Sequence, residues 1–244
     1  AENVSIRLAH KIGVLARTGD LEVDNSSRST TDGGARLFVS SRGPNQIVAI
    51  DASSRRWRRL TTAPLDQSGY CMEWCDGRLY VACGHKQVFL DSLHAFNEAT
   101  GLWEDLPSMP RVCCYGASGV IGNELFIAGG FNFSRGDLAT LQIYDIAART
   151  WRLGPPLPDE LTRSGTSQLH GVVLDGKLFV VPSRGESILV YEPESNSWAE
   201  EPGFPGYPEM GRTVRAFAHG GRLVVFQENG AAFWRTSDGV TWLR

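Results

Sequence analysis

Hydrophobic and polar residues alternate along this chain in short segments, and one short apolar segment recurs five times. In each copy a leucine is followed by two aromatic or β-branched residues, which is the composition of a buried β-strand. A two-residue turn signal made of Gly, Asp or Asn precedes each copy and tolerates the positive φ of a tight hairpin. The pattern predicts five equivalent strands, at residues 36–39, 78–81, 124–127, 177–180 and 222–225.

Tryptophans mark the same repeat farther along each copy. Five of the seven tryptophans are separated by 46, 48, 47 and 44 residues, and a period in the forties is typical of propeller repeats. A large apolar residue stands seven positions before each of the first four, and the polar residues between suit a hairpin loop. We therefore predict equivalent outer strands at Trp57, Trp103, Trp151, Trp198 and Trp242.

A further short strand, rich in small residues, precedes four of the five turns, as in residues 115–120 and 169–174. Each repeat thus contains four antiparallel strands, which is the architecture of a propeller blade. The predicted fold class is an all-β propeller over residues 31–244, with five visible repeats in a small or an incomplete ring. Residues 1–30 form an N-terminal segment that is expected to contribute a strand to the first or the last blade.

Composition narrows the functions open to such a propeller. The formal net charge is -3, with 24 Lys+Arg against 27 Asp+Glu, which argues against nucleic-acid and membrane-surface binding because both need a basic excess. The cysteine count is odd, and Cys71 and Cys75 lack the second ligand pair of a zinc finger. We expect reduced thiols, no metal, no cofactor, no membrane span, and a cytoplasmic or nuclear protein.

The third repeat carries a recognisable motif. Gly129 and Gly130 follow its apolar strand, and Tyr144 precedes Trp151 by seven residues, an arrangement that resembles the kelch motif. The second repeat keeps half of the glycine doublet, as Cys83 followed by Gly84, and the other repeats lack it. Five copies in register therefore resemble a kelch-type β-propeller.

The details of the repeats most resemble those of plant F-box/kelch-repeat proteins. Degenerate doublets, Asp-Gly turns and proline-containing tails such as residues 103–110 support this likeness. The resemblance implies a propeller that recognises a target protein, joined to a ubiquitin ligase through a separate helical F-box. It implies a binding function and no catalytic residues.

Loops that join strands two and three, and loops that join blades, meet on one face of a propeller, where rigid blades hold them. In this chain those loops carry arginines, although the chain as a whole has a net negative charge. We predict that they bind an acidic or phosphorylated segment of a partner protein, with Phe89, Phe131, Phe133 and Tyr207 as apolar anchors. The predicted partner-binding residues are Arg42, Lys86, Arg111, Phe131, Arg135, Arg163, Arg184 and Arg212.

A carbohydrate-active or galactose oxidase-like enzyme is the alternative function, because the propeller fold hosts many chemistries. His170 and His219 fall on inner strands of adjacent blades and could approach each other. The sequence contains no HxH, HExxH or GxSxG pattern and no P-loop. Protein binding is therefore the preferred function.

Overall fold

β-Strands make up the fold of the residues that the structure describes. The computed structural model describes residues 36–40, 46–51, 57–64, 68–85, 88–132, 134–158, 168–183, 187–203, 214–219, 221–227, 232–235 and 242–243. Within these ranges there are twenty-one strands and no helix, as the repeated β-branched and aromatic segments lead one to expect. The described ranges accordingly hold no helix with the length and apolarity to cross a bilayer.

Four of the sheets contain four antiparallel strands each, and each strand pairs with the next strand of its sheet along the chain. Their strands are β4 (Cys71–Cys75), β5 (Arg78–Ala82), β6 (Leu93–Asn97) and β7 (Leu102–Leu106); β8 (Ala117–Ile121), β9 (Glu124–Ala128), β12 (Leu141–Asp145) and β13 (Thr150–Leu153); β14 (Leu169–Leu174), β15 (Lys177–Pro182), β16 (Ser187–Glu192) and β17 (Ser197–Pro202); and β18 (Val214–His219), β19 (Arg222–Gln227), β20 (Ala232–Arg235) and β21 (Trp242–Leu243).

The first sheet has three described strands, β1 (Arg36–Ser40), β2 (Gln46–Asp51) and β3 (Trp57–Thr62). A small hairpin of β10 (Phe131–Asn132) and β11 (Gly136–Asp137) is inserted between β9 and β12. The expected strand from residues 1–30 lies outside the described residues, and it stays a prediction.

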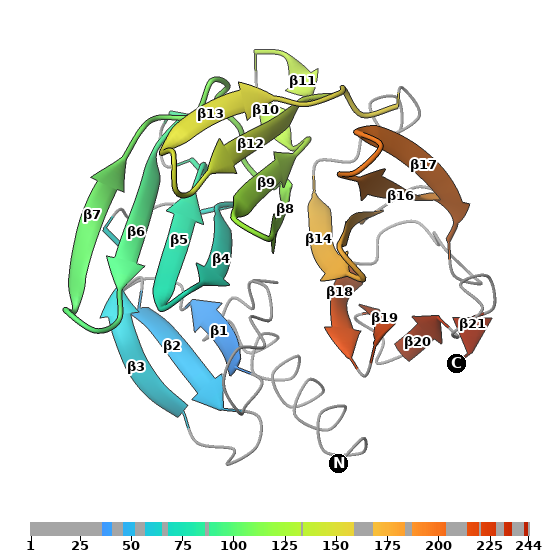
Figure 1. Ribbon diagram of the computed structural model, residues 1–244. Coiled ribbons are helices and arrows are strands. Elements are labelled where there is room, and N and C mark those ends of the chain that lie inside the picture. Colours follow the sequence, from blue (N-terminus) through green and yellow to red (C-terminus); the bar gives the residue numbers. More distant parts are fainter. Residues whose placement is uncertain are drawn as a thin grey trace.

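The sheets follow one another around a common centre, so that each is a propeller blade (Figure 1). The inner strands β4, β8, β14 and β18 contact one another in this order, and β3, β7, β13 and β17 lie at the periphery. The predicted class of all-β, four-stranded propeller blades is confirmed.

Alternation along the strands divides each blade's apolar side chains between its two neighbours. In β9, Leu125 and Ile127 pack toward the second blade, whereas Phe126 and Ala128 pack toward the fourth. Equivalent clusters fill the other two junctions between described blades. Strands buried on both faces explain the continuous apolar runs in the sequence.

The inner strands of the third and fourth blades are in direct backbone contact. A Cβ atom at Gly171 would lie 1.9 Å from the carbonyl oxygen of Ser118, so only glycine fits there. At the preceding junction the Ser118 hydroxyl donates a hydrogen bond of 2.7 Å to Glu73, whose exposed fraction is 1%. Gly171 and Ser118 on the inner strands therefore permit the close approach of neighbouring blades.

The predicted outer tryptophans occupy equivalent positions. Each pairs across its hairpin with the residue seven positions earlier, and the rings of the three aromatic pairs lie 5.0–5.3 Å apart. The pairs are Ile50 with Trp57, Phe96 with Trp103, Tyr144 with Trp151, Tyr191 with Trp198 and Arg235 with Trp242. The seven-residue spacing thus encodes cross-strand neighbours.

Each of three indole rings also reaches the preceding blade. Trp103 donates its Nε1–H to the carbonyl oxygen of Thr62 at 2.9 Å. Trp151 donates to Pro107 at 2.7 Å, and the Trp198 indole donates to the Pro155 carbonyl at 3.0 Å. These tryptophans therefore join neighbouring blades through a hydrogen bond as well as through packing.

Candidate partner-binding face

In the second and third blades, the described parts of the connections from strand two to strand three and of the connection between the two blades lie at the same end and are hydrogen-bonded. The amide of Gly84, after β5, donates to the carbonyl of Cys113 in the loop before β8 at 2.9 Å. Leu138, after the β10–β11 hairpin, donates to Gly130 at 2.8 Å. Backbone hydrogen bonds thus hold the loops of the second and third blades as one surface.

The glycine doublet of the third blade sets the direction of its loop. Gly129 and Gly130 have φ values of 65° and 94°, in the left-handed region that favours glycine. Cys83 and Gly84 adopt the same backbone in the second blade, at 56° and 103°. The second blade therefore keeps the geometry of the doublet although its sequence keeps only one glycine.

Three of the eight predicted partner-binding residues are described. The side chains of Arg111 and Arg135 are exposed, and Phe131 is half-buried. Arg111 and Arg135 form no ion pair with any other part of the chain that the structure describes. Arg42, Lys86, Arg163, Arg184 and Arg212 lie outside the described residues, as do Phe133 and Tyr207.

The structure places the loop of Arg111 beside the hairpin of Phe131 and Arg135. Cys114 and Phe131 exchange two backbone hydrogen bonds, of 3.1 and 2.8 Å. The side chain of Asn132 donates to the carbonyl of Val112 at 3.4 Å. The predicted site therefore contains two exposed arginines, Arg111 and Arg135, on adjoining loops. Phe131 lies in the same hairpin as Arg135, where its backbone pairs with the loop of Arg111.

A buried glutamine fixes the backbone of Arg111. Gln142 on β12 has an exposed fraction of 0%, accepts the Arg111 N–H at 2.8 Å and donates to the Arg111 carbonyl at 3.1 Å. Sequence reasoning missed this residue. The signal available was a lone amide within the apolar strand Leu141–Asp145.

Four aromatic side chains form a cluster on this surface: His85, Phe89, Tyr115 and Phe131. The His85 ring lies 5.9 Å from Phe89 and 5.8 Å from Tyr115, and Phe89 lies edge-on to Phe131 at 6.3 Å. All four are half-buried. The sequence singled out Phe89 and Phe131, whereas His85 and Tyr115 entered no prediction about this surface.

Tyr115 has an unusual backbone conformation, with φ at 58°. A bulky residue in this region is strained and is held there by its surroundings. Its amide donates to Gly69 at 2.7 Å and its carbonyl accepts from Leu169 at 3.0 Å, which ties the second, third and fourth blades together. The ring lies against Gly69, where a Cβ atom would be 2.8 Å from Tyr115 Cε1.

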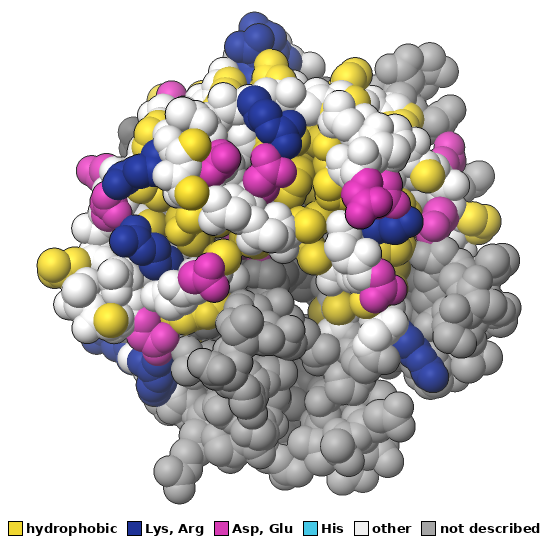
Figure 2. Space-filling view, in the orientation of Figure 1, with side chains coloured by type: hydrophobic (Ala, Val, Ile, Leu, Met, Phe, Trp, Pro, Cys, Tyr) yellow, Lys and Arg dark blue, Asp and Glu magenta, His cyan; other side chains and the backbone are white. Residues whose placement is uncertain are grey.

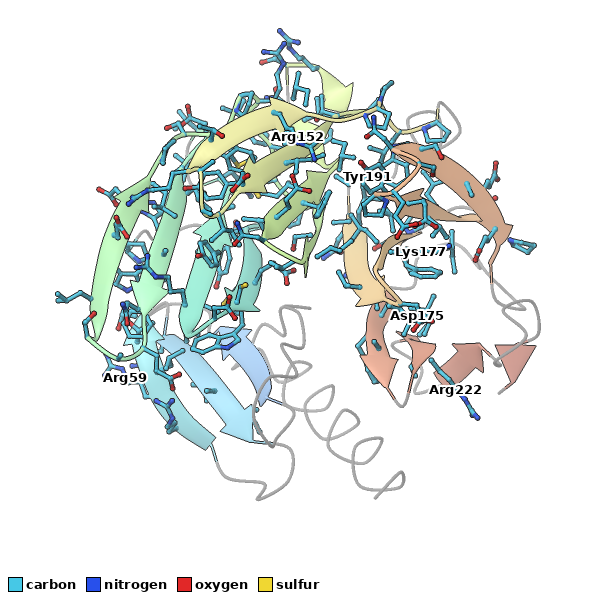
Figure 3. The ribbon with its side chains drawn as sticks, in the orientation of Figure 1. Arg59, Arg152, Asp175, Lys177, Tyr191 and Arg222 are labelled. Atoms are coloured by element: carbon cyan, nitrogen blue, oxygen red, sulfur yellow. The ribbon has the colours of Figure 1, made fainter. Side chains whose placement is uncertain are left out.

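On the side of the molecule shown in Figure 2, positive and negative side chains lie close to one another and form ion pairs. Lys and Arg side chains there lie interspersed with Asp and Glu. Hydrogen bonds from Arg149 and then Arg78 lower the pKa of Glu104, and Arg152 pairs with Glu124 at 2.8 Å. Figure 3 labels Arg152 and Lys177 on this side, the latter paired with Glu192. These charges neutralise one another.

His170 and His219, the two histidines considered for an enzyme, are not seen together in a catalytic arrangement among the described side chains. His170 is buried and its Nε2 lies 3.4 Å from the hydroxyl of Ser183, while the side chain of His219 is outside the described residues. The described residues contain no group of three His, Cys, Asp or Glu side chains arranged to hold a metal ion.

All five cysteines are buried free thiols, whereas half-buried thiols in strands were expected, and only Cys71 and Cys75 lie in a strand. Burial raises the pKa of Cys114 to about 12, and burial with the nearby Asp76 raises that of Cys75 to about 11. Burial likewise raises the pKa of Tyr80 to about 12. The folded protein therefore holds these groups in their neutral forms.

The raised pKa values predict a loss of stability at alkaline pH. Each group is neutral in both states below its ordinary pKa, so its stabilising contribution is complete there and is lost as pH rises toward the folded value. For Cys75 and Cys114 the window runs upward from 9.0. We expect the thermal unfolding midpoint to fall steadily between about pH 9 and pH 11.

The control for this pH series is Cys114→Ala, measured by circular dichroism at the same pH values. It should make the decline shallower whatever its effect on the midpoint at pH 7. An unchanged slope would show that Cys114 ionises equally in both states.

The repeated blades and their joined loops define the class of protein: a propeller repeat protein with a composite loop surface. A family model, the Kelch motif, matches residues 113–158, which include the glycine doublet and the Tyr144–Trp151 pair. The chain therefore carries a kelch repeat, and it resembles plant F-box/kelch-repeat proteins.

Curated relatives come from plants and animals. An F-box/kelch-repeat protein of Arabidopsis thaliana is 26% identical over 204 residues, which is 79% of this chain and 46% of that protein. A second one is 24% identical over 57% of the chain and 36% of its own length. Human Kelch-like protein 33 is 29% identical over 46% of the chain and 21% of that protein. The matched part thus spans less than half of each relative, and the matches support a protein-interaction module.

Proposed function

We propose that this propeller recognises the target protein of a ubiquitin-ligase adaptor of the F-box/kelch type, acting in the cytoplasm or nucleus. The observation that carries the proposal is the joined surface of the second and third blades. There Arg111 and Arg135 stand exposed on adjoining loops beside a cluster of aromatic rings. The adaptor role rests on the F-box/kelch-repeat relatives.

An acidic or phosphorylated segment of the partner fits this surface by charge. Guanidinium groups bind carboxylates and phosphates through paired hydrogen bonds, and binding is stronger where the site is partly shielded from water. The Arg111 backbone is already fixed by Gln142, and Arg135 lies in a turn closed by its amide to the Asn132 carbonyl at 3.1 Å. Little backbone conformational freedom is therefore lost on binding.

Replacing Arg135 with alanine should weaken partner binding by about 1–3 kcal/mol and leave the unfolding midpoint unchanged, since the side chain is exposed. Arg135→Lys should recover only part of the loss, because the planar fork is absent. The measurement is a titration of the purified partner, which a pull-down with mass spectrometry must first identify. Raising the salt concentration should weaken the complex.

Arg222→Ala is the matched control. This exposed arginine follows the turn between β18 and β19, the first two strands of the fifth blade, at the end of the blades opposite to the proposed site. Figure 3 shows its side chain extending away from the sheet. The Arg222→Ala variant removes one positive charge, as Arg135→Ala does, but leaves the proposed site unchanged. Its affinity for the partner should therefore be unchanged. Equal losses for Arg135→Ala and Arg222→Ala would reduce the effect to net charge and contradict the proposal.

The adaptor role is tested separately, with the full-length protein in a reconstituted ubiquitination reaction. The identified partner should receive ubiquitin, and the Arg111→Ala, Arg135→Ala double variant should lower the rate in proportion to its lost affinity. Binding without ubiquitin transfer would retain the recognition surface and reject the ligase adaptor.

A further inference from the structure

Four of the five thiols, those of Cys71, Cys83, Cys113 and Cys114, lie together beneath the surface formed by the second and third blades. Cys71, Cys83 and Cys113 belong to one buried cluster, which also includes Cys75 at the other end of β4, and Cys114 follows Cys113 directly in the chain. We propose that Cys71 and Cys83 are an oxidation site: hydroperoxides convert this dithiol to a disulfide that fastens the base of the second blade's loop.

The two sulfur atoms are already in contact. The Sγ atoms of Cys83 and Cys71 are 3.5 Å apart, across a sequence separation of 12 residues. Disulfide formation requires the sulfurs to approach by about 1.5 Å, a movement within reach of side-chain rotation. The β4–β5 pairing holds the backbone of Cys71 opposite Ala82, and the amide of the next residue, Cys83, donates to the carbonyl of Ser92 at 3.0 Å.

The left-handed conformation of Cys83 makes this contact possible. In a regular strand, successive side chains point to opposite faces, so Cys83 would point away from the face shared by Cys71 and Ala82. With φ at 56° the chain departs from the strand, and Cys71, Ala82 and Cys83 all pack in one cluster. A cysteine at the first position of the doublet is thus what brings the second sulfur to Cys71.

The chemistry balances with hydrogen peroxide as oxidant. The Cys71 sulfur attacks one peroxide oxygen, the O–O bond breaks, and Cys71 becomes a sulfenic acid while one water molecule leaves. The Cys83 sulfur then attacks the Cys71 sulfur, an S–S bond forms, and a second water molecule carries away the hydroxyl group and the thiol proton. We assign the first attack to Cys71, because Cys83 is fully buried and burial raises the pKa of its thiol well above the ordinary value, which disfavours the reactive thiolate.

Oxidation would affect the candidate binding surface because Cys83 lies where the loop of the second blade leaves β5. Cys83 is followed directly by Gly84 and His85, and His85 is part of the aromatic cluster. A disulfide between Cys71 and Cys83 would fix the start of this loop. It would also link the two ends of residues 71–83, which restricts the unfolded chain and so stabilises the folded state. The oxidation chemistry is independent of the proposed ligase role, so either can fail without the other.

The test uses the whole chain, treated with hydrogen peroxide, quenched, and unfolded in acid with N-ethylmaleimide so that thiols cannot exchange. Peptide mapping should find the Cys71 and Cys83 peptides linked, two hydrogen atoms lighter than their sum, and separated again by dithiothreitol. The unfolding midpoint of the oxidised protein should rise by about 5–10 °C, since the bridge constrains the unfolded chain.

Two variants assign the effect. Cys71→Ser should abolish both the linked peptide and the rise of the midpoint, whereas Cys75→Ser, on the same strand but without the Cys83 contact, should keep both. If mapping of the unaltered protein finds both residues alkylated after oxidation, the site does not exist. A Cys83–Cys113 link in place of the Cys71 link would equally overturn the assignment.

Discussion

Gly130→Ala should destabilise the propeller by about 2–5 kcal/mol, measured by chemical denaturation. Two effects add at this position. The φ of 94° lies in a region that residues with a Cβ atom adopt only under strain. The new Cβ atom would lie 2.6 Å from the carbonyl oxygen of Cys114 and 3.0 Å from the amide nitrogen of Gly116. Neither contact can be relieved by turning a flexible side chain.

Gly122→Ala separates the two effects. Gly122 also has a positive φ, of 58°, but a Cβ atom there would have nothing within 4 Å. We expect a loss of about 1 kcal/mol, the cost of the left-handed backbone alone. If both variants lose the same free energy of unfolding, the steric contact with the Cys114 loop contributes nothing and our account of the doublet is wrong.

Trp151→Ala should lower the free energy of unfolding by about 3–5 kcal/mol. The indole packs on the cluster between the second and third blades, 5.0 Å from the ring of Tyr144. It also donates to the Pro107 carbonyl of the second blade. Alanine removes both interactions and leaves a gap at the periphery of the junction.

Trp151→Phe keeps an aromatic ring beside Tyr144 and removes only the donor, so a loss of about 1–2 kcal/mol is expected. Exposed Arg59→Ala, on β3, is the neutral reference, with a change within about 0.5 kcal/mol. A Trp151→Ala variant as stable as that reference would show that the tryptophan period marks sequence ancestry rather than a contact between blades.

The repeat was predictable because its signals are local. The seven-residue spacing of Tyr144 and Trp151 follows from one hairpin, whose register places the two residues opposite each other. Turn pairs such as Asp175 with Gly176 adopt the positive φ values that their composition predicted. Each such feature depends on residues close in the chain, and repetition supplies independent copies of the same signal.

The binding surface was only partly predictable because its contacts join distant loops. Exposed Arg111 and Arg135 could be found from charge and loop position, but the amide of Gln142 reaches Arg111 across 31 residues. Tyr115 gives no sign in the sequence of its left-handed backbone, which contacts with Gly69 and Leu169 impose. The left-handed Cys83 is similar: its backbone has the conformation of the first doublet glycine although the residue is not a glycine.

The indole hydrogen bonds between blades have a direction. Trp103, Trp151 and Trp198 each bind a carbonyl that precedes them in the chain by 41 to 44 residues, and in each case the acceptor belongs to the blade before. During synthesis the acceptor has therefore always left the ribosome before its donor. A new blade can dock on a finished neighbour as soon as its own tryptophan emerges, and no bond of this set waits for the end of the chain. Assembly from the amino end, one blade at a time, is thus built into which residue donates and which accepts.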